Sequence, residues 1–216
     1  MDKLFIVTGA NRGLGKALAE RLLEADQSVL AINRSSSSKS ENTIICDLAD
    51  ATQLNELTEK LKKMTKYHEI IFINNAGVIE PIGNIGSFLS IDKIQQHINV
   101  NYLAPICIIN ALMQIKNINL KVINVTTGAA ERYLEGWSLY GSSKKAVKVA
   151  LDTLMMENSN IDIVHFDPGV IDTNMQTKIR DSEFKLKERF VLYKEKQKLQ
   201  APEEVAKRII RECNII

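Results

Sequence analysis

The chain has 216 residues, of which 45% are hydrophobic and 25% charged, so it is long enough for one sizeable core and short for two. Its net charge of +2 is too small for the concentrated basic face of a nucleic-acid or membrane partner. Cys46, Cys107 and Cys213 match no metal-ligand spacing, and the N-terminal apolar run is too short for a signal peptide or a membrane span. We therefore expect a single domain in the cytoplasm, with reduced thiols and no metal.

Apolar runs of strand length alternate with segments of helical periodicity along the whole chain. The runs occupy residues 4–8, 28–32, 43–46, 69–73, 121–125 and 161–166, and the helical segments include 15–25, 51–64 and 104–115. Because the runs are apolar throughout, they predict parallel strands covered on both faces. The fold class is thus α/β, with a doubly wound parallel sheet of six strands over residues 1–216. The loops that follow the strands share one edge, where such sheets bind ligands.

Three segments lie outside this alternation. The tract Ser35–Ser40 is expected to form a flexible loop after the second strand. Residues 174–200 mix charged with apolar residues, which predicts one or two amphipathic helices that form a variable lid on the substrate side. A last helix is expected near Pro202, which suits a first helical turn, while Glu203 and Glu204 complement the helix dipole.

A glycine-rich loop, TGANRGLG (Thr8 to Gly15), follows the first strand and opens the first helix. Its glycines allow a tight turn and a close approach of the backbone to a pyrophosphate, which the N–H groups and dipole of the helix would hold. Glycine also serves the packing of such turns alone, but the place of this loop between strand and helix favours nucleotide binding. The candidate contacts are Gly9, Asn11, Arg12, Gly13, Leu14 and Gly15.

The end of the second strand carries Asn33 and Arg34, where a carboxylate would bind the 2′-hydroxyl of a dinucleotide ribose. An arginine at this place accommodates a 2′-phosphate, and Arg12 in the glycine loop supplies a second cation. The alternative is that Arg34 is merely solvated. We expect NADP(H) to be preferred over NAD(H).

Tyr140 stands four residues before Lys144, in a segment typical of a helix start. Residues four apart share a helix face, so the Lys144 ammonium is expected near the Tyr140 phenol. A nearby cation lowers the pKa of a tyrosine towards working pH and makes it a usable proton donor or acceptor. The alternative is a chance pairing on an exposed helix.

With these motifs in order, the chain resembles the short-chain dehydrogenases/reductases over nearly its whole length. The glycine loop matches TGxxxGxG, CDL (Cys46 to Leu48) matches the acidic strand end at the adenine, and NNAG (Asn74 to Gly77) follows the fourth strand. VNYL (Val100 to Leu103), YGSSK (Tyr140 to Lys144) and PGVIDT (Pro168 to Thr173) match the catalytic asparagine region, YxxSK and PGxxxT. The resemblance implies a single Rossmann-like domain. Its further cofactor contacts would be Asp47, Leu48, Asn75, Ala76, Gly77, Tyr140, Lys144, Pro168, Gly169, Ile171 and Thr173.

The resemblance also implies the roles of four catalytic residues. Tyr140 is the proton donor, Lys144 grips the nicotinamide ribose while lowering the Tyr140 pKa, and Asn101 anchors a water in the proton path. The family's serine, thirteen positions before the tyrosine, is Thr127 in this chain. A threonine keeps the hydroxyl that holds the substrate oxygen. Its added methyl group reduces the space on the substrate side and so the range of substrates. Thr126 is one residue too far from Tyr140 for this role.

Within the family, EPIG (Glu80 to Gly83), GWSLY (Gly136 to Tyr140) and PGVIDTNMQ are most similar to the sepiapterin reductase and benzil reductase group, whose substrates carry adjacent carbonyls. The implied function is NADPH-dependent reduction of a small-molecule ketone or vicinal dicarbonyl to an alcohol. Tyr133, Trp137 and Met175 would line the substrate pocket, or else serve packing alone. Reduction of a 3-oxoacyl thioester and a noncatalytic NADPH-sensing role are the alternative functions.

The family's usual seventh strand is not expected, because the chain ends directly after the last helix. Without that strand, the substrate wall would be open or would be completed by a neighbouring subunit. A homodimer, or a homotetramer of two dimers, is implied by the apolar helices that carry Asn101 and Tyr140. His97 is expected to be a surface or packed histidine and not a proton relay. His68 and His165 lack paired ligand spacing, so no metal is assigned.

Overall fold

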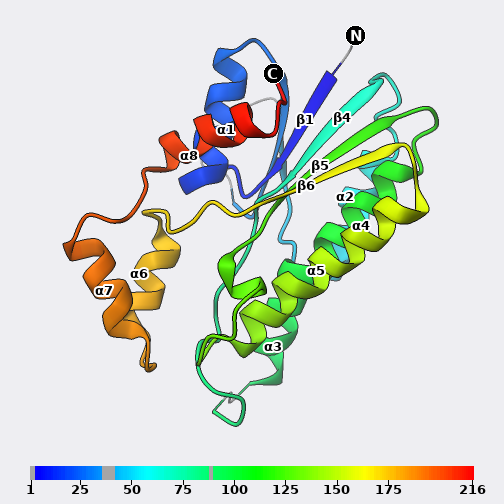
Figure 1. Cartoon of the computed structure of the whole chain (residues 1–216). Coiled ribbons are helices and arrows are strands. Elements are labelled where there is room, and N and C mark those ends of the chain that lie inside the picture. Colours follow the sequence, from blue (N-terminus) through cyan, green and yellow to red (C-terminus); the bar gives the residue numbers. More distant parts are fainter. Residues whose placement is uncertain (1–2, 36–41, 88–89) are drawn as a thin grey trace.

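The computed structural model describes residues 3–35, 42–87 and 90–216. Six parallel strands form one sheet: β1 (Lys3–Thr8), β2 (Ser28–Asn33), β3 (Thr43–Ile45), β4 (Glu69–Asn74), β5 (Asn119–Val125) and β6 (Ile161–Phe166). Their order is β3-β2-β1-β4-β5-β6, so the chain winds outward from β1 in both directions (Figure 1). The predicted doubly wound sheet is confirmed, and no strand follows β6 among the described residues. Most of the expected serine-rich loop, residues 36–40, lies outside them.

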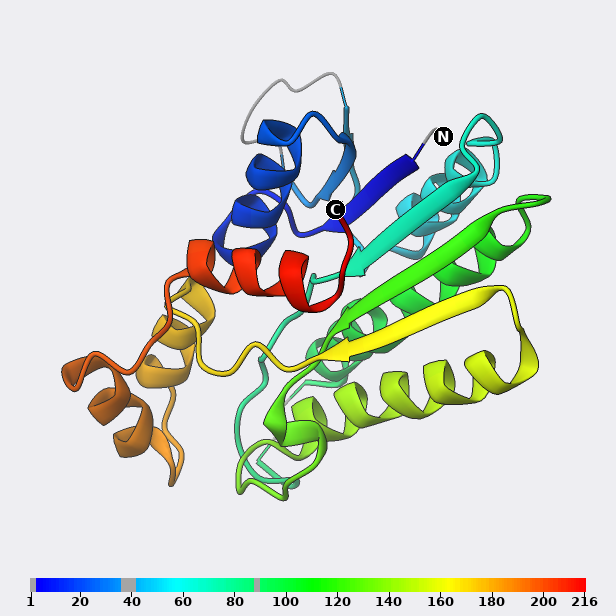
Figure 2. The same cartoon turned by 45° about the horizontal axis from the view of Figure 1, so that its top comes forward.

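Helices cover both faces of the sheet (Figure 1, Figure 2). α2 (Ala51–Leu61), α4 (Ala104–Met113) and α5 (Ser138–Glu157) lie on one face, and α1 (Gly13–Glu24) and α8 (Pro202–Glu212) on the other. α3 (Ile91–Ile98) leads through a π-helical turn, η1 (Asn99–Leu103), directly into α4. α6 (Asn174–Asp181) and α7 (Lys187–Glu195) occupy the segment expected to hold one or two amphipathic helices. In the described part of the chain, no helix combines the length and apolar character that a membrane crossing requires.

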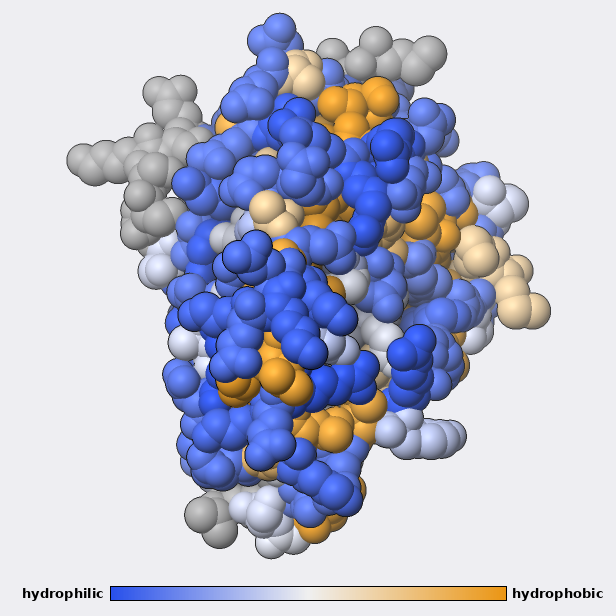
Figure 3. Space-filling view, turned by 60° about the vertical axis from the view of Figure 1, so that its left-hand side comes forward, coloured by the Kyte–Doolittle hydropathy of each residue, from blue (hydrophilic) through white to orange (hydrophobic). Residues whose placement is uncertain are grey.

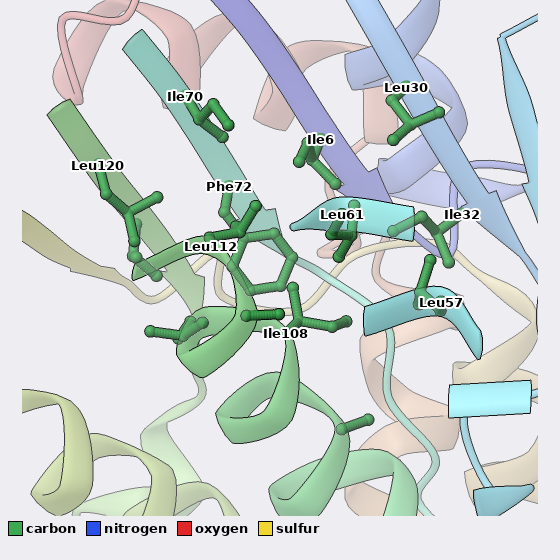
Figure 4. Packing of buried hydrophobic residues seen from close by; sticks show 14 of the residues in the cluster. Ile6, Leu30, Ile32, Leu57, Leu61, Ile70, Phe72, Ile108, Leu112 and Leu120 are labelled. Atoms are coloured by element: carbon green, nitrogen blue, oxygen red, sulfur yellow. The ribbon is translucent and has the colours of Figure 1, made fainter. Parts of the chain in front are cut away.

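The alternation of side chains along β1 shows why its residues are apolar throughout. Leu4 and Ile6 pack on the face of α2, α4 and α5, while Phe5 and Val7 pack on the face of α1 and α8. Figure 4 shows the first face, where side chains of the strands meet those of α2 and α4. Each side chain of this size contributes about 1.5–3 kcal/mol when it is buried, so both faces hold the sheet between its helices.

Two helices begin at residues that favour a helix start. Asp50 caps α2, because its carboxylate accepts the backbone N–H groups of Thr52 and Gln53 at 2.9 and 3.0 Å. α8 begins at Pro202, as predicted, with two glutamates in its first turn. α8 packs on α1, so the last helix supports the element that carries the glycine loop.

A chain of hydrogen-bonded polar side chains crosses the carboxyl end of the sheet. Asn74 on β4 donates from Nδ2 to Asn124 Oδ1 on β5 at 2.9 Å, and Asn124 Nδ2 lies 3.0 Å from His165 Nδ1 on β6. Since an amide nitrogen only donates, His165 carries its own hydrogen on Nε2, which lies 2.9 Å from Asp152 Oδ1 on α5. These bonds join β4, β5, β6 and α5 near the carboxyl ends of the strands. They therefore help to position the loops that follow these strands.

In the described part of the chain, two ion pairs join the α6–α7 segment to the loops of the main body. Lys178 on α6 pairs with Glu80 after β4, and Lys185 pairs with Glu135 at 2.8 Å. Exposed pairs of this kind contribute at most about 1 kcal/mol each. Figure 3 views the molecule from the side of α6 and α7, where hydrophilic residues cover most of the face and apolar side chains show between them. Apolar packing around buried Phe190 therefore contributes more than the ion pairs to holding this segment.

Candidate active site

The loops at the carboxyl edge of the sheet enclose a cleft of about 850 Å³. The glycine loop and the residues after β2 and β3 line one end, and the start of α5 together with α6 and α7 lines the other. Of the predicted cofactor, catalytic and substrate residues, all line this cleft except Gly15, Asn101 and Tyr133. One cavity thus brings together motifs that the sequence spreads over most of the chain.

The glycine loop requires glycine at two places for different reasons. Gly9 has a φ of +68°, in the left-handed region, and its N–H bonds the Ile32 carbonyl at 2.8 Å, which joins the loop to β2. At Gly15 a Cβ would lie 2.3 Å from the Gly9 carbonyl oxygen and 2.5 Å from Asn75 Nδ2, too close for any side chain. Gly15 therefore lies behind the cleft and lets α1 approach the loop.

The N-terminus of α1 faces the cleft with its backbone donors uncapped. α1 begins at Gly13 with Arg12 as its N-cap residue, and no side chain of the described residues caps the first N–H groups. These N–H groups and the positive end of the helix dipole are the features that bind a pyrophosphate. A Cβ added at Gly13 would lie 3.1 Å from Thr173 Cγ2, so the PGVIDT segment closes the other side of this cradle. The cradle fits the phosphates of a dinucleotide.

Among the residues that the structure describes, three cationic side chains line the end of the cleft beside β2. Arg12 and Arg34 are the predicted pair, and Lys16, one turn after Arg12 on α1, joins them. Sequence reasoning missed Lys16, although a spacing of four on the first helix was the signal. Asp47 lines the same end, whereas buried Asn33, whose Oδ1 has no hydrogen-bond partner among the described residues, does not line the cleft. The three cations and Asp47 fit an adenosine ribose with an anionic substituent.

The loop after β4 connects the glycine loop to the middle of the cleft. Thr8 Oγ1 accepts the backbone N–H groups of Asn75 and Ala76, each at 3.1 Å, and Asn75 Nδ2 donates to the Thr8 carbonyl at 2.8 Å. Asn75 therefore holds two loops together besides lining the cleft. At Gly77 a Cβ would lie 3.3 Å from Asn101 Oδ1 and 3.7 Å from Lys144 Nζ, so the backbone here runs close to both candidate catalytic residues.

Three of the four predicted catalytic side chains, Thr127, Tyr140 and Lys144, form one wall of the cleft. Tyr140 and Lys144 lie one turn apart on α5 and are 7% and 5% exposed, and Lys144 Nζ donates to the Val125 carbonyl at 3.0 Å. Thr127, two residues after β5, caps the 3₁₀ turn η2 (Gly128–Ala130). Its Oγ1 accepts the Ala129 N–H at 3.3 Å, so the hydroxyl hydrogen remains available to a ligand.

The expected direction of the Tyr140 pKa shift is wrong. Burial of the phenol raises its pKa above the ordinary value, and the nearby Asp167 carboxylate raises it further. Burial also lowers the pKa of Lys144 from 10.5 to about 8, because the ammonium loses its water. Desolvation, which spacing along a helix does not reveal, is the largest cause of the Tyr140 shift. Tyr140 is therefore a neutral phenol at pH 7, the form that donates a proton.

Asn101 lies behind the wall, in the π-helical turn η1, and is 2% exposed. Its Oδ1 accepts the Val78 N–H at 2.9 Å, and its Nδ2 donates to the Val78 carbonyl at 2.7 Å. Asn101 Nδ2 also lies 2.8 Å from His97 Nε2, and His97 is fully buried. The Asn101 amide is thus committed to protein partners and shapes the loop after β4 instead of facing the cleft. His97 proves to be packed, one of the two expected outcomes, but its contact with Asn101 was missed.

Aromatic rings continue the wall beyond Tyr140. Trp137 meets Tyr140 edge to face at 5.5 Å between ring centroids, and it stacks on Phe190 of α7 at 5.3 Å with 15° between the planes. Tyr193 meets Phe190 edge to face at 5.8 Å. All four residues line the cleft. This end therefore offers flat apolar surface to a ligand next to Tyr140.

The predicted substrate-lining residues have different outcomes. Trp137 and Met175 line the cleft, as expected. Tyr133 does not line it, because the turn before α5 leaves its side chain fully exposed to solvent. Phe190 and Tyr193 were not predicted, although apolar residues at helical spacing within 174–200 were the available signal.

The three cysteines of the chain, Cys46, Cys107 and Cys213, are free thiols, and one of them, Cys46, lines the cleft. Burial raises the pKa of Cys46 to about 11. Across residues 3–35, 42–87 and 90–216, no cluster of three or more His, Cys, Asp or Glu side chains has the arrangement of a metal site. The donors that the cleft does offer are backbone N–H groups, cations and hydroxyls, which suit a dinucleotide and a carbonyl oxygen.

The chain is similar to known proteins over most of its length. Benzil reductase ((S)-benzoin forming) of Bacillus subtilis (strain 168) is 32% identical over 221 residues, which cover 94% of this chain and 90% of that protein. Sepiapterin reductase of Rattus norvegicus is 26% identical, over 82% of this chain and 77% of that protein. Among solved structures, that of the KRED1-Pglu enzyme matches with a TM-score of 0.82 at 30% identity, over 94% of this chain and 91% of the other. Residues 3–183 match the short chain dehydrogenase family, so the chain belongs to that family of NAD(P)-dependent oxidoreductases, which act on alcohols and carbonyl compounds.

Proposed function

We propose that the protein uses NADPH to reduce a ketone or vicinal dicarbonyl to an alcohol, with Tyr140 as the proton donor. The observation that carries the proposal is the common wall of Tyr140, Lys144 and Thr127 in a cleft that also contains the glycine loop. A protein that only sensed NADPH would need the glycine-loop end alone. Two hydroxyl donors and an aromatic wall at the other end favour an enzyme.

Thr127, Tyr140 and Lys144 have different roles at the carbonyl oxygen of the substrate. The bound cofactor supplies a hydride to the carbonyl carbon. The Thr127 hydroxyl donates a hydrogen bond to the oxygen as negative charge develops there. Tyr140 transfers its phenolic proton to that oxygen, and its raised pKa keeps the proton in place until the oxygen becomes basic. The Lys144 ammonium, still charged at neutral pH with a pKa of about 8, stabilises the phenolate that remains.

The charge at the adenosine end favours NADPH over NADH. Arg12, Lys16 and Arg34 line this end, and Asn33 stands where a carboxylate would select NAD. Guanidinium groups bind a phosphate dianion by charge-assisted hydrogen bonds. The single tryptophan, Trp137, lies in the cleft and provides a fluorescence signal for titrating both cofactors. NADPH should bind at least about tenfold more tightly than NADH.

A vicinal dicarbonyl with aryl substituents fits the substrate end best. Two of the bacterial relatives are named benzil reductase. The wall formed by Trp137, Phe190 and Tyr193 gives aromatic groups a surface, where ring pairs contribute about 0.5–1.5 kcal/mol beyond the buried area.

A panel of simple ketones, aryl 1,2-diketones and a 3-oxoacyl thioester, each incubated with NADPH, tests this proposal by the loss of NADPH absorbance. We expect the fastest oxidation with a diketone. If the thioester were reduced fastest, the proposed substrate class would be wrong, but the proposed mechanism would stand. Tight NADPH binding without oxidation on any member of the panel would instead favour the sensor.

We also propose a cytoplasmic homodimer joined through α4 and α5, with a tetramer of two dimers as the alternative. Leu103, at the end of η1 next to α4, and Val149 and Met156 on α5 are 39%, 54% and 88% exposed. Apolar side chains at such exposure are suited to a two-fold interface. Light scattering that gave a monomer at micromolar concentration would contradict the dimer.

A further inference from the structure

His97 contacts Asn101 at the place where the helix changes its geometry. It lies in the last turn of α3, four residues before Asn101, and is 0% exposed. In the π-helical turn η1, the Ala104 N–H bonds the Asn99 carbonyl, five residues back. His97 and Asn101 therefore share one face of a helix that is locally widened.

The partners of His97 determine which ring nitrogen carries the hydrogen. Nδ1 lies 2.8 Å from the Glu80 carbonyl oxygen, which can only accept, so Nδ1 is the donor. Nε2 lies 2.8 Å from Asn101 Nδ2, which can only donate. Nε2 is also 3.1 Å from Ser143 Oγ, but that hydroxyl donates to the Tyr140 carbonyl at 2.9 Å. The arrangement thus requires a neutral ring with its hydrogen on Nδ1 and an acceptor on Nε2.

This ring completes the set of bonds that fixes the Asn101 amide. One hydrogen of Nδ2 goes to the Val78 carbonyl and the other to His97 Nε2, while Oδ1 accepts the Val78 N–H. The reversed amide would place its oxygen against the Val78 carbonyl. The contacts with His97 and with Val78 therefore favour the same orientation of the Asn101 amide. Because all of these groups are buried or half-buried, a lost partner is not replaced cheaply by water.

The fixed amide lies next to the catalytic wall. Asn101 Oδ1 and Lys144 Nζ both lie within 4 Å of the position of a Cβ at Gly77. A displaced Asn101 would therefore move the Ala76–Val78 backbone, which lines the cleft, and the surroundings of the Lys144 ammonium.

The charges around His97 keep it in the required state. Burial lowers its pKa, while the bond to the Glu80 carbonyl raises it, the Lys144 ammonium on α5 lowers it and the Leu139 carbonyl raises it, and the net direction is downward. The Tyr140 ring, also on α5, meets the imidazole edge to face at 6.2 Å and is neutral. The Glu80 carboxylate is engaged with Lys178. A neutral His97 is thus available at pH 7 as the acceptor for Asn101.

We propose that His97 is a positioning residue for carbonyl reduction, acting as a neutral Nδ1–H imidazole that fixes the Asn101 amide and, through it, the loop beside Lys144. The inference rests on the proposed function only for its effect on the rate. The arrangement of the amide and the tautomer are properties of the protein itself.

Two matched variants distinguish the contact of His97 Nδ1 from that of His97 Nε2. His97→Asn keeps a nitrogen donor near the Nδ1 position for the Glu80 carbonyl and places no acceptor at the Nε2 position. His97→Gln carries an amide oxygen out to the Nε2 position. With an aryl 1,2-diketone and saturating NADPH, we expect His97→Asn to lower kcat by about 10–100-fold, and His97→Gln to recover kcat to within about threefold of the wild type. The NADPH dissociation constant should change less than kcat in both variants, because the glycine-loop end stays intact while only the Ala76–Val78 and Lys144 contacts shift.

Nitrogen NMR tests the same inference without activity. In protein labelled at histidine and asparagine, His97 should show a protonated Nδ1 and an unprotonated Nε2, and the Asn101 Nδ2 signals should shift in His97→Asn and return in His97→Gln. Protonation on Nε2, or unchanged Asn101 signals in His97→Asn, would overturn the proposal. Equal kcat values in the two variants, or losses of kcat that follow only the unfolded fraction in thermal melts, would also overturn it. A wild type inactive on all carbonyls would refute the proposed function, while the NMR result would still decide the inference.

Discussion

Thr127→Val removes one hydroxyl from the wall of the cleft and keeps the shape of the side chain. Thr127 Oγ1 accepts the Ala129 N–H at 3.3 Å, and loss of this bond should lower the stability by about 0.5–1.5 kcal/mol. Loss of the donor to the carbonyl oxygen should raise the activation barrier by about 2.7–4 kcal/mol, so that kcat falls by about 10²–10³-fold. A melting temperature lower by about 1–6 °C cannot account for a rate effect of this size. The two effects are therefore separable.

Steady-state kinetics with an aryl 1,2-diketone, together with NADPH titration by Trp137 fluorescence, measures both. NADPH affinity should barely change. Thr127→Ser keeps the hydroxyl and should retain kcat within about tenfold, with a wider range of bulky ketones as the methyl is lost. Thr126→Val is the matched control, because Thr126 Oγ1 is buried without a hydrogen-bond partner among the described residues. If Thr127→Val kept full kcat while Thr126→Val lost it, the hydroxyl of Thr126 would be the one that acts on the substrate.

Three further predictions test the cofactor site and the buried lysine. Gly15→Ala would place a Cβ 2.3 Å from the Gly9 carbonyl oxygen, so it should cost about 1–3 kcal/mol of stability and weaken NADPH binding, whereas an unchanged melting curve would refute the close approach of α1. Arg34→Asp, alone or with Arg12→Ala, should weaken NADPH binding by about tenfold or more and leave NADH nearly unaffected, as measured by fluorescence titration, whereas equal effects would show that neither arginine binds the 2′-phosphate. Burial lowers the pKa of Lys144 from 10.5 to about 8, so between these values the unfolded chain binds more protons than the folded protein, and stability rises with pH. The melting temperature of the wild type relative to Lys144→Met should therefore be constant below about pH 8 and rise from there towards pH 10, and parallel curves would contradict the buried charge.

The sheet was predictable because each of its strands carries its signal locally. Residues such as Phe5 and Ile6 face opposite layers, so a strand covered on both sides has to be apolar at every position. The glycine loop was predictable for a similar reason. The turn itself requires glycine at Gly9, which has a positive φ, and at Gly15, where a side chain would clash. Lys144 was placed beside Tyr140 by helical periodicity alone.

Features that depend on packing between distant segments were not predictable. The raised pKa of Tyr140 follows from burial and from Asp167, which comes from the loop after β6. The aromatic wall needs α7 folded back onto the start of α5, so the sequence did not distinguish Phe190, which lines the cleft, from Tyr133, which is exposed. The tautomer of His97 depends on the Glu80 carbonyl, seventeen residues away in the chain. Propensity and spacing carry no information on such contacts.

The most direct test of the proposed mechanism compares the wild type with Tyr140→Phe, both saturated with NADPH and supplied with an aryl 1,2-diketone. The wild type should oxidise one NADPH for each hydroxyketone formed. Tyr140→Phe should bind NADPH with the same affinity and lose kcat by about 10²–10⁴-fold, because the ring remains and only the proton donor is removed. Equal kcat values in the two proteins would contradict the account, and so would a wild type that binds NADPH tightly and never oxidises it.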